Sequence, residues 1–216
     1  MPDTVLAAPL RPPSARTRHT RLPRGPGERV RVREILSYLA AALPADTSAG
    51  ARLLALQCAL RMNAYMRVDL PAGLLCGLRV DAVEACRELE RARWLGVANG
   101  TGTTGVTAEL RDVTLLSQAS ARPDRRRAAD WALRTGSPAR IGAAEPLRLA
   151  GIYLAAHSDP SLGEGRSECD RIIRDCGLHG EGFHGALTRL TANGVLDGWR
   201  ICPASGDVHW TLAPRP

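Results

Sequence analysis

Four residues whose side chains could ligate a metal ion lie in the C-terminal third of the chain: Cys169, Cys176, His179 and His184. Cys176 and His179 have a spacing that metal ligands use, but the set matches no standard zinc signature. None of the six cysteines forms a Cys-x-x-Cys pair. Because free cysteine commonly behaves as a small apolar residue, we expect Cys76, Cys86 and Cys176 in the core. Metal binding or redox sensing is the alternative, and we expect no metal and no cofactor.

The chain offers little for catalysis. All 29 basic residues are arginines, so neither a phosphate-binding loop with its Lys-Ser/Thr ending nor a lysine Schiff base can form. The glycine-rich stretch from Asn99 to Gly105 lacks that ending. No serine, histidine and aspartate set has a recognisable nucleophile elbow. We therefore expect a binding protein and not an enzyme.

The arginines are unevenly distributed along the chain. Residues 1–33 carry eight arginines and two acidic residues, a net charge of +6, and residues 111–140 carry seven and three, a net charge of +4. Residues 34–110 and 141–216 have net charges of −1 and −2. An excess of positive charge affects which partners the chain associates with, but it does not determine the fold. Such an excess suits a polyanionic partner such as DNA, and the candidate contacts in these segments are Arg16, Arg18, Arg21, Arg24, Arg125, Arg126 and Arg127.

Residues 1–33 form a tail rich in arginine and proline. This composition cannot bury enough apolar surface to offset the loss of chain entropy, so we expect the tail to be disordered. The apolar stretch from Val5 to Leu10 is too short for a signal peptide and has no basic residue before it. No stretch is long enough to span a membrane. We expect a cytoplasmic, nucleoid-associated protein with reduced cysteines.

One motif occurs twice, as Cys76-Gly77-Leu78 and Cys176-Gly177-Leu178, 100 residues apart. After the second copy, apolar residues recur at i, i+3, i+4 and i+7, which predicts an amphipathic helix carrying Phe183, Ala186, Leu187 and Leu190. Gly194 supplies the stop of this helix. Helices are also predicted over 145–157 and 167–175, and strands over 196–202 and 208–212. The second unit therefore spans residues 145–216.

The first unit, residues 34–110, has the same order of elements. Helices are predicted over 33–43, from an N-cap at Ser48 to about Ala64, from Pro71 to Cys76, and from Leu78 to Arg93. Strands are predicted over 66–70, 94–98 and 106–110, the last two joined by a glycine-rich turn. Residues 111–144 are interpreted as a basic linker that contains a helix over 123–135.

Helix, helix, tight turn, helix and β-hairpin is the order of the winged helix-turn-helix family, and both units resemble it. The second unit is the closer match, with a glycine and an apolar residue at the turn and Gly194-Val195-Leu196 leading into the wing. In the first unit the apolar positions fall one residue early, and Trp94 stands where the family has glycine. The expected fold class is mainly α with small β-hairpins (α+β), as two winged helix-turn-helix modules in tandem.

The resemblance implies binding of double-stranded DNA, with the third helix of each unit in the major groove and the hairpin at the flanking backbone. A bacterial transcriptional regulator is the function it favours. The implied DNA-contacting residues are Arg79, Arg87, Arg91, Thr101 and Thr103 in the first unit, and His179, Glu181, His184, Thr188, Arg189 and Arg200 in the second.

Acidic residues on the predicted third helix of the first unit support other interpretations. Glu84 and Glu88 alternatively form solvated pairs with Arg87 and Arg91 at i,i+3 spacing. Tandem winged-helix proteins with near-neutral faces also act as protein-interaction or chromosome-organisation factors, and a plasmid or phage replication initiator is a narrower DNA-binding alternative. A protein partner or a homodimer therefore stays open beside DNA.

Overall fold

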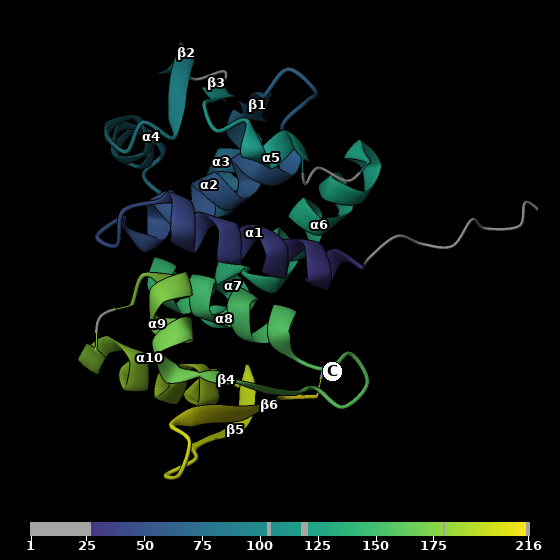
Figure 1. Ribbon diagram of the computed structural model, residues 1–216, viewed down its shortest axis with the longest axis vertical. Coiled ribbons are helices and arrows are strands. Elements are labelled where there is room, and N and C mark those ends of the chain that lie inside the picture. The colour runs from purple at the N-terminus through teal and green to yellow at the C-terminus, as the bar shows by residue number, and fades with distance from the viewer. Residues whose placement is uncertain (1–26, 103–104, 118–120, 179, 215–216) are drawn as a thin grey trace, which may run out of the picture.

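The computed structural model describes residues 27–214 except 103–104, 118–120 and 179, and it has a mixed α+β fold (Figure 1). Two three-stranded antiparallel sheets lie at opposite ends of the long axis, with helices packed between them. The expected α+β class is confirmed at this level.

The first unit follows the expected order of elements: α2 (Ala49–Arg61), β1 (Arg67–Pro71), α3 (Ala72–Leu78), α4 (Ala82–Arg91), β2 (Leu95–Gly102) and β3 (Gly105–Leu110). Ser48 caps α2 as expected, because its side chain accepts a hydrogen bond from the backbone N–H of Ala51. The sheet has the order β1-β3-β2. The strand β1 therefore pairs with the far strand of the hairpin.

The second unit repeats this order with α8 (Glu145–His157), β4 (Glu164–Glu168), α9 (Cys169–Cys176), α10 (Gly180–Ala192), β5 (Leu196–Ile201) and β6 (Asp207–Leu212). Its sheet has the corresponding order β4-β6-β5. The sequence did not predict β4, because Glu-Gly-Arg-Ser-Glu contains no β-branched or aromatic residue. The strand exists because it pairs with β6, where the ring of Trp210 covers Gly165 so closely that a Cβ there would lie 2.2 Å from it.

Two further long helices, α1 (Glu28–Ala42) and α6 (Arg122–Thr135), pack between the units. The short helices are α5 (Thr114–Ser117) and α7 (Pro138–Ile141), of which α7 packs on α8. The helix α1 begins at Glu28, so the expected disordered tail is wrong for residues 28–33. The reason is a continuous buried stripe of Val32, Leu36 and Leu39, which extends the helix toward the N-terminus.

The interpretation of residues 111–144 as a linker is also wrong. Ala128, Ala129 and Ala132 of α6 are fully buried, and the helix packs on α1 and α2. The sequence shows these alanines among arginines, and alanine contributes little to an apolar pattern. The buried side of α6 is therefore made by close helix packing that the sequence pattern does not reveal.

The helices α1 and α6 each pack on the other unit. The helix α1, which precedes the first unit, contacts α8, and α6, which precedes the second unit, contacts α2. We call them the exchanged helices. From α1, Arg29 Nη1 donates to the carbonyl of Ser158 at 3.2 Å, directly after α8 of the second unit. From α6, Arg125 Nη2 donates to the carbonyl of Met62 at 2.7 Å, directly after α2 of the first unit. Each repeat therefore consists of an exchanged first helix followed by the six elements of a unit.

A second pair of contacts is reciprocal as well. Arg52 and Arg148 are each the fourth residue of α2 and α8, and both are almost fully buried. Arg148 Nη1 lies 3.4 Å from the carbonyl oxygen of Arg79, at the turn of the first unit. Arg52 Nε lies against Gly177 at the corresponding turn of the second unit, 2.7 Å from the position of a Cβ. Reciprocal contacts of this kind mean that an approximate two-fold axis relates the units.

The turns before the third helices align differently from the repeated Cys-Gly-Leu motif. The residue in the left-handed conformation is Arg79 (φ 46°) in the first unit and Gly177 (φ 59°) in the second. Leu78 therefore corresponds to Cys176, each being the last residue of its helix. The sequence placed this turn at Gly77, because glycine is the usual left-handed residue.

The third helices end in equivalent turns. Arg93 (φ 56°) corresponds to Gly194 (φ 66°). The residue in the place of the family glycine is therefore Arg93 and not, as the sequence suggested, Trp94. Trp94 corresponds to Val195, because their backbone N–H groups donate to Leu89 and Leu190 at equivalent positions of the third helices. An arginine therefore takes the left-handed position twice in the first unit.

Because one core runs through both units, we expect a single cooperative unfolding transition. Replacing Arg52 or Arg148 by Met should each lower the free energy of unfolding by about 3 kcal/mol, because buried carbonyl groups lose a charged donor. Urea titration followed by tryptophan fluorescence measures both effects. Arg134→Met, at an exposed position of α6, is the matched control. Two separate transitions, or a change below about 0.5 kcal/mol in both variants, would contradict the shared core.

Candidate nucleic-acid interface

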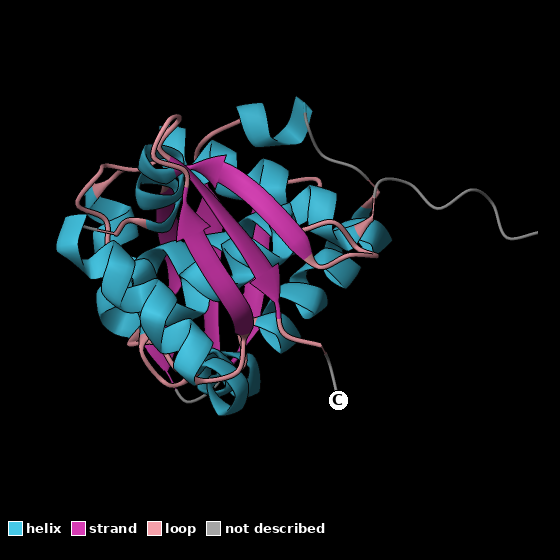
Figure 2. Ribbon diagram, turned by 90° about the horizontal axis from the view of Figure 1, so that it is seen from below, coloured by secondary structure: helices cyan, strands magenta, loops and turns pink. Residues whose placement is uncertain are grey.

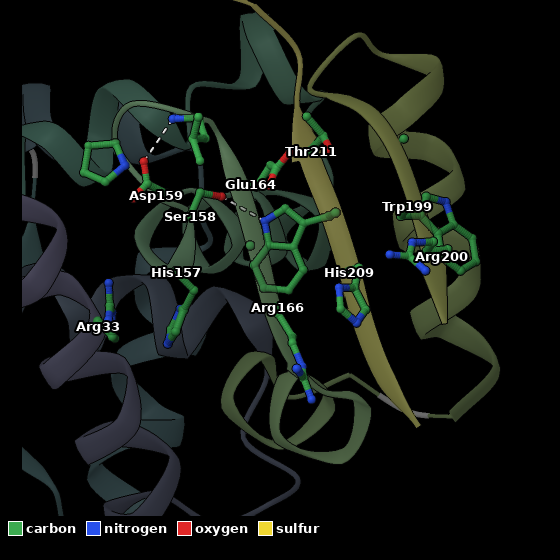
Figure 3. Close-up of a pocket in the computed structure, with 15 residues that line it drawn as sticks. Arg33, His157, Ser158, Asp159, Glu164, Arg166, Trp199, Arg200, His209 and Thr211 are labelled. Carbon is green, nitrogen blue, oxygen red and sulfur yellow. Dashed lines mark hydrogen bonds between the residues drawn. The ribbon is translucent and has the colours of Figure 1, made fainter. Parts of the chain in front are cut away.

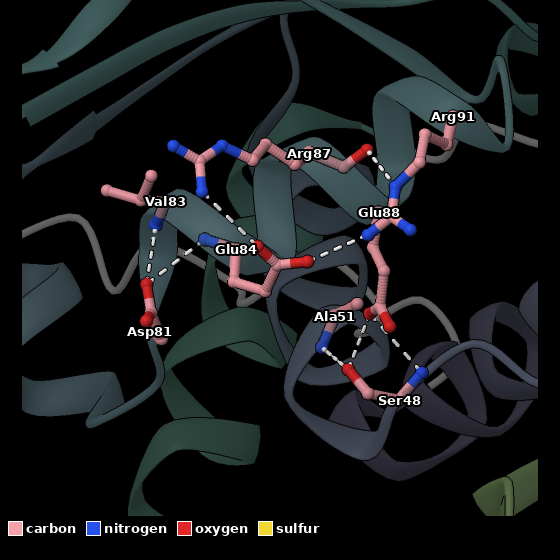
Figure 4. A network of polar contacts seen from close by, with 8 residues as sticks. All are labelled: Ser48, Ala51, Asp81, Val83, Glu84, Arg87, Glu88 and Arg91. Carbon is pink, nitrogen blue, oxygen red and sulfur yellow. Dashed lines mark hydrogen bonds and ion pairs between the residues drawn. The ribbon is translucent and has the colours of Figure 1, made fainter.

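The exposed surface of α4 is a closed network of charged side chains (Figure 4). Glu84 accepts hydrogen bonds from Arg87 Nη1 at 3.4 Å and from Arg91 Nη2 at 2.7 Å. The side chains of Glu84, Arg87 and Arg91 are 51%, 66% and 69% exposed. Both arginines therefore face solvent, as the sequence predicted, but one carboxylate partly neutralises them before any partner binds.

The base of α4 is held by two further carboxylates. Asp81 caps the helix by accepting from the backbone N–H groups of Val83 and Glu84. Glu88 accepts from the side chain and the backbone N–H of Ser48, at the start of α2. The predicted pairing of Glu84 with Arg87 is present. Glu88 instead fixes α4 to α2 and belongs to the support of the surface (Figure 4).

The exposed surface of α10 carries far less charge. His184, Thr188 and Arg189 are exposed, as expected from the apolar stripe on the opposite side of the helix. The hydroxyl of Thr188 donates to the carbonyl of His184 at 3.0 Å. The imidazole of His184 meets the ring of Trp199 on β5 edge to face, with centroids 5.9 Å apart. The histidine is therefore positioned by the hairpin of its own unit.

The structure describes only some of the other residues that were predicted to contact DNA. Arg79 is exposed at the turn before α4, and Arg200 is exposed on β5 opposite His209. Thr101 lies on β2 and Glu181 on α10, but their side chains are outside the described part of the structure. Thr103 and His179 lie outside the described residues altogether.

The described parts of the basic segments lie apart from the third helices. Figure 1 shows α4 and α10 on one side of the molecule, on the left, whereas the chain enters α1 at Glu28 on the other side. Arg126 and Arg127 are exposed on α6, and Arg127 pairs with Asp124. Arg125 is buried, which contradicts its expected role in DNA contact. The tail residues Arg16, Arg18, Arg21 and Arg24 lie outside the described residues.

A groove of about 820 Å³ lies where the loop between α8 and β4 meets α1 and the second sheet (Figure 3). In Figure 2, which looks along the long axis, strands lie in front of the central helices at this end. Arg166 is paired with Asp207, and Arg33 Nη2 donates to the carbonyl of Ala156 at 3.0 Å. The groove therefore offers less free positive charge than its arginines indicate, and it also contains Asp159 and Glu164.

The cysteines differ in their surroundings: hydrogen bonds from Ser205 and from the backbone of Ala204 lower the pKa of the Cys202 thiol, whereas Cys58, Cys86 and Cys176 are buried. Burial raises the pKa of the Cys176 thiol, and it raises the pKa of Cys86 to about 11. Both lie in the core, as expected, but Cys76 is exposed because α3 turns it toward solvent. Within the described ranges, no group of three or more His, Cys, Asp or Glu residues could hold a metal ion.

Comparison with known proteins finds no matching family model, no matching curated protein and no matching solved structure. In the described part of the chain, no helix has both the length and the apolar character that crossing a membrane requires.

Stability should depend on pH through His157. Its ring stacks on Tyr153 with centroids 3.9 Å apart, and burial lowers the pKa of His157 to about 4. The unfolded chain binds a proton near pH 6.5, so the free energy of unfolding should fall as the pH decreases from 6.5 to about 4. His157→Gln should reduce this fall, measured by urea titrations at several pH values.

The exposed His184 supplies the matched control for this measurement. His184→Gln should keep the pH dependence of the original protein, because its ring is outside the core. A free energy of unfolding that falls with pH as steeply in His157→Gln as in the original protein would show that burial of His157 is not the cause of the fall.

Proposed function

We propose that the protein binds double-stranded DNA in a sequence-specific way, as two winged helix-turn-helix units in one chain. The observation that carries the proposal is the same construction at both ends of the molecule. In each unit a left-handed turn directs an exposed third helix outward, and a three-stranded sheet with a hairpin follows it. This order and geometry support insertion of α4 and α10 into the major groove.

The side chains on these helices are suited to reading bases. Arginine donates two parallel hydrogen bonds to guanine, and Glu84 can accept from the amino group of cytosine. His184 and Thr188 offer shorter polar groups on α10, at which Gly182 and Gly185 let the backbone approach closely. Arg200, on the strand β5, is suited to a phosphate beside the groove. A bacterial transcriptional regulator or a replication initiator would use such a surface.

The neutral surface of α4 favours a second candidate, binding of a protein partner. Its exposed cations Arg87 and Arg91 share one carboxylate, Glu84, on the same helix, and such partly neutralised surfaces attract polyanions weakly. Selection from a random duplex library with the purified full chain distinguishes the two functions. Enrichment of one sequence class supports DNA reading, whereas no enrichment favours the protein partner.

Arg87→Ala and Arg91→Ala should each weaken the complex with the selected duplex. For an arginine that reads a base we expect a loss of roughly 1–3 kcal/mol, together with relaxed preference at one position. Fluorescence anisotropy with the selected duplex and with single-base variants measures both effects. Arg134→Ala, at an exposed arginine on α6, should leave the base preference unchanged at every position. Unchanged affinity in the α4 variants would remove α4 from the interface.

Glu84→Gln should act in the opposite direction on unselected DNA. The amide keeps the shape of the side chain but no longer neutralises Arg87 and Arg91. Affinity for random duplex should rise by about 1 kcal/mol at low salt, and binding should depend more steeply on salt. Glu34→Gln breaks another i,i+3 pair, with the less exposed Arg31 on α1, and is the control. Weaker binding of random duplex by Glu84→Gln would overturn the neutralising role.

A further inference from the structure

We infer that one copy of this chain reads a single DNA site made of two unlike half-sites in inverted orientation. The inference deepens the proposed function and rests on it. The proposed function requires only that α4 and α10 contact bases. The orientation, identity and number of half-sites follow from how the two units are joined.

The inverted orientation follows from the reciprocal contacts between the units. Arg148 of the second unit reaches the turn at Arg79, and Arg52 of the first unit reaches the turn at Gly177. The exchanged helices repeat this reciprocity, since Arg29 and Arg125 bind the carbonyls that follow α8 and α2. Units placed head to tail would instead use two different surfaces. An approximate two-fold axis therefore relates α4 to α10.

A single duplex can meet both helices at once. Figure 1 shows α4 and α10 on the same side of the molecule and at opposite ends of its long axis. A two-fold axis that emerges between two reading helices matches the dyad of a DNA duplex. Such symmetry directs the two helices toward half-sites of opposite orientation.

The distance between the half-sites is fixed by the protein. Both units share one apolar core, and α2 and α8 are buried along nearly their whole length between them. Arg148 of the second unit donates to the carbonyl of Arg79 in the first unit, and the side chain of Arg52 packs against Gly177 of the second unit. The units therefore do not move independently as beads on a linker would. Inserting about half a helical turn, roughly 5 base pairs, should turn one half-site away from its reading helix.

The two half-sites must differ in sequence because the reading helices differ. The exposed side of α4 carries Glu84, Arg87 and Arg91, which suit guanine and cytosine. The exposed side of α10 carries His184, Thr188 and Arg189. The protein therefore resembles a dimer in geometry but reads a site that is not a perfect palindrome.

The test uses the sequence selected by the full chain and four duplexes made from it. These contain the selected inverted pair, the same half-sites as a direct repeat, one half-site alone, and the inverted pair with 5 inserted base pairs. We expect the intact inverted pair to bind at least tenfold more tightly than the other three, with one protein per duplex. Anisotropy titration gives the affinities, and native mass spectrometry gives the stoichiometry.

Single substitutions on α4 and α10 show which helix contacts which half-site. Arg87→Ala should relax base preference only in one half, and His184→Ala only in the other. Equal affinity for the direct and inverted pairs, a stoichiometry of two proteins per duplex, or relaxation of both halves by one variant would overturn the inference and leave DNA reading standing. Failure to select any sequence would instead remove the proposed function itself.

Discussion

The exchange of α1 and α6 between the two units is the constraint on which the rest of the structure depends. Both α2 and α8 are apolar around nearly their whole circumference and are buried along nearly their whole length. A helix of this kind cannot face water. Each is covered by its own unit, by the other unit and by an exchanged helix. Neither unit therefore has a complete core of its own, and α4 and α10 are held in one rigid frame.

The buried arginines explain how two such units hold a fixed relative orientation. A turn in the left-handed conformation leaves backbone carbonyls near its outer side, and arginine can satisfy several acceptors at once with its planar fork. Burial lowers the pKa of Arg52 and of Arg148, but guanidinium remains charged at neutral pH. Each charge must therefore keep its carbonyl partners. For Arg148, this requirement ties α8 of the second unit to the turn of the first unit at Arg79. The carbonyl partners of Arg52 are Pro44 and Thr47, and they hold its side chain against the turn of the second unit at Gly177.

Much of the fold could be predicted from local patterns, whereas the relation between the units could not. The stripe of α10 and the cap at Ser48 carry their own signals, and both are confirmed. The strand β4 has no such signal and depends on pairing with β6. Arg125 was expected at DNA but is buried, because its partner is a carbonyl 63 residues away. The exposed residues of α4 were predicted, but the pairing of Glu84 with both Arg87 and Arg91 depends on side-chain conformations.

The proposed function gives a physical role to the charges on α4 and to the uneven distribution of arginines along the chain. Glu84 holds Arg87 and Arg91 in place before binding, so these arginines lose less side-chain freedom when they meet a base. The same carboxylate weakens their long-range attraction to phosphate, because opposite charges so close together largely cancel at a distance. Attraction must then come from elsewhere, and the excess positive charge lies in residues 1–33 and 111–140. The nearly neutral units are thus suited to distinguishing one base sequence from another, and the basic segments are suited to attracting DNA of any sequence.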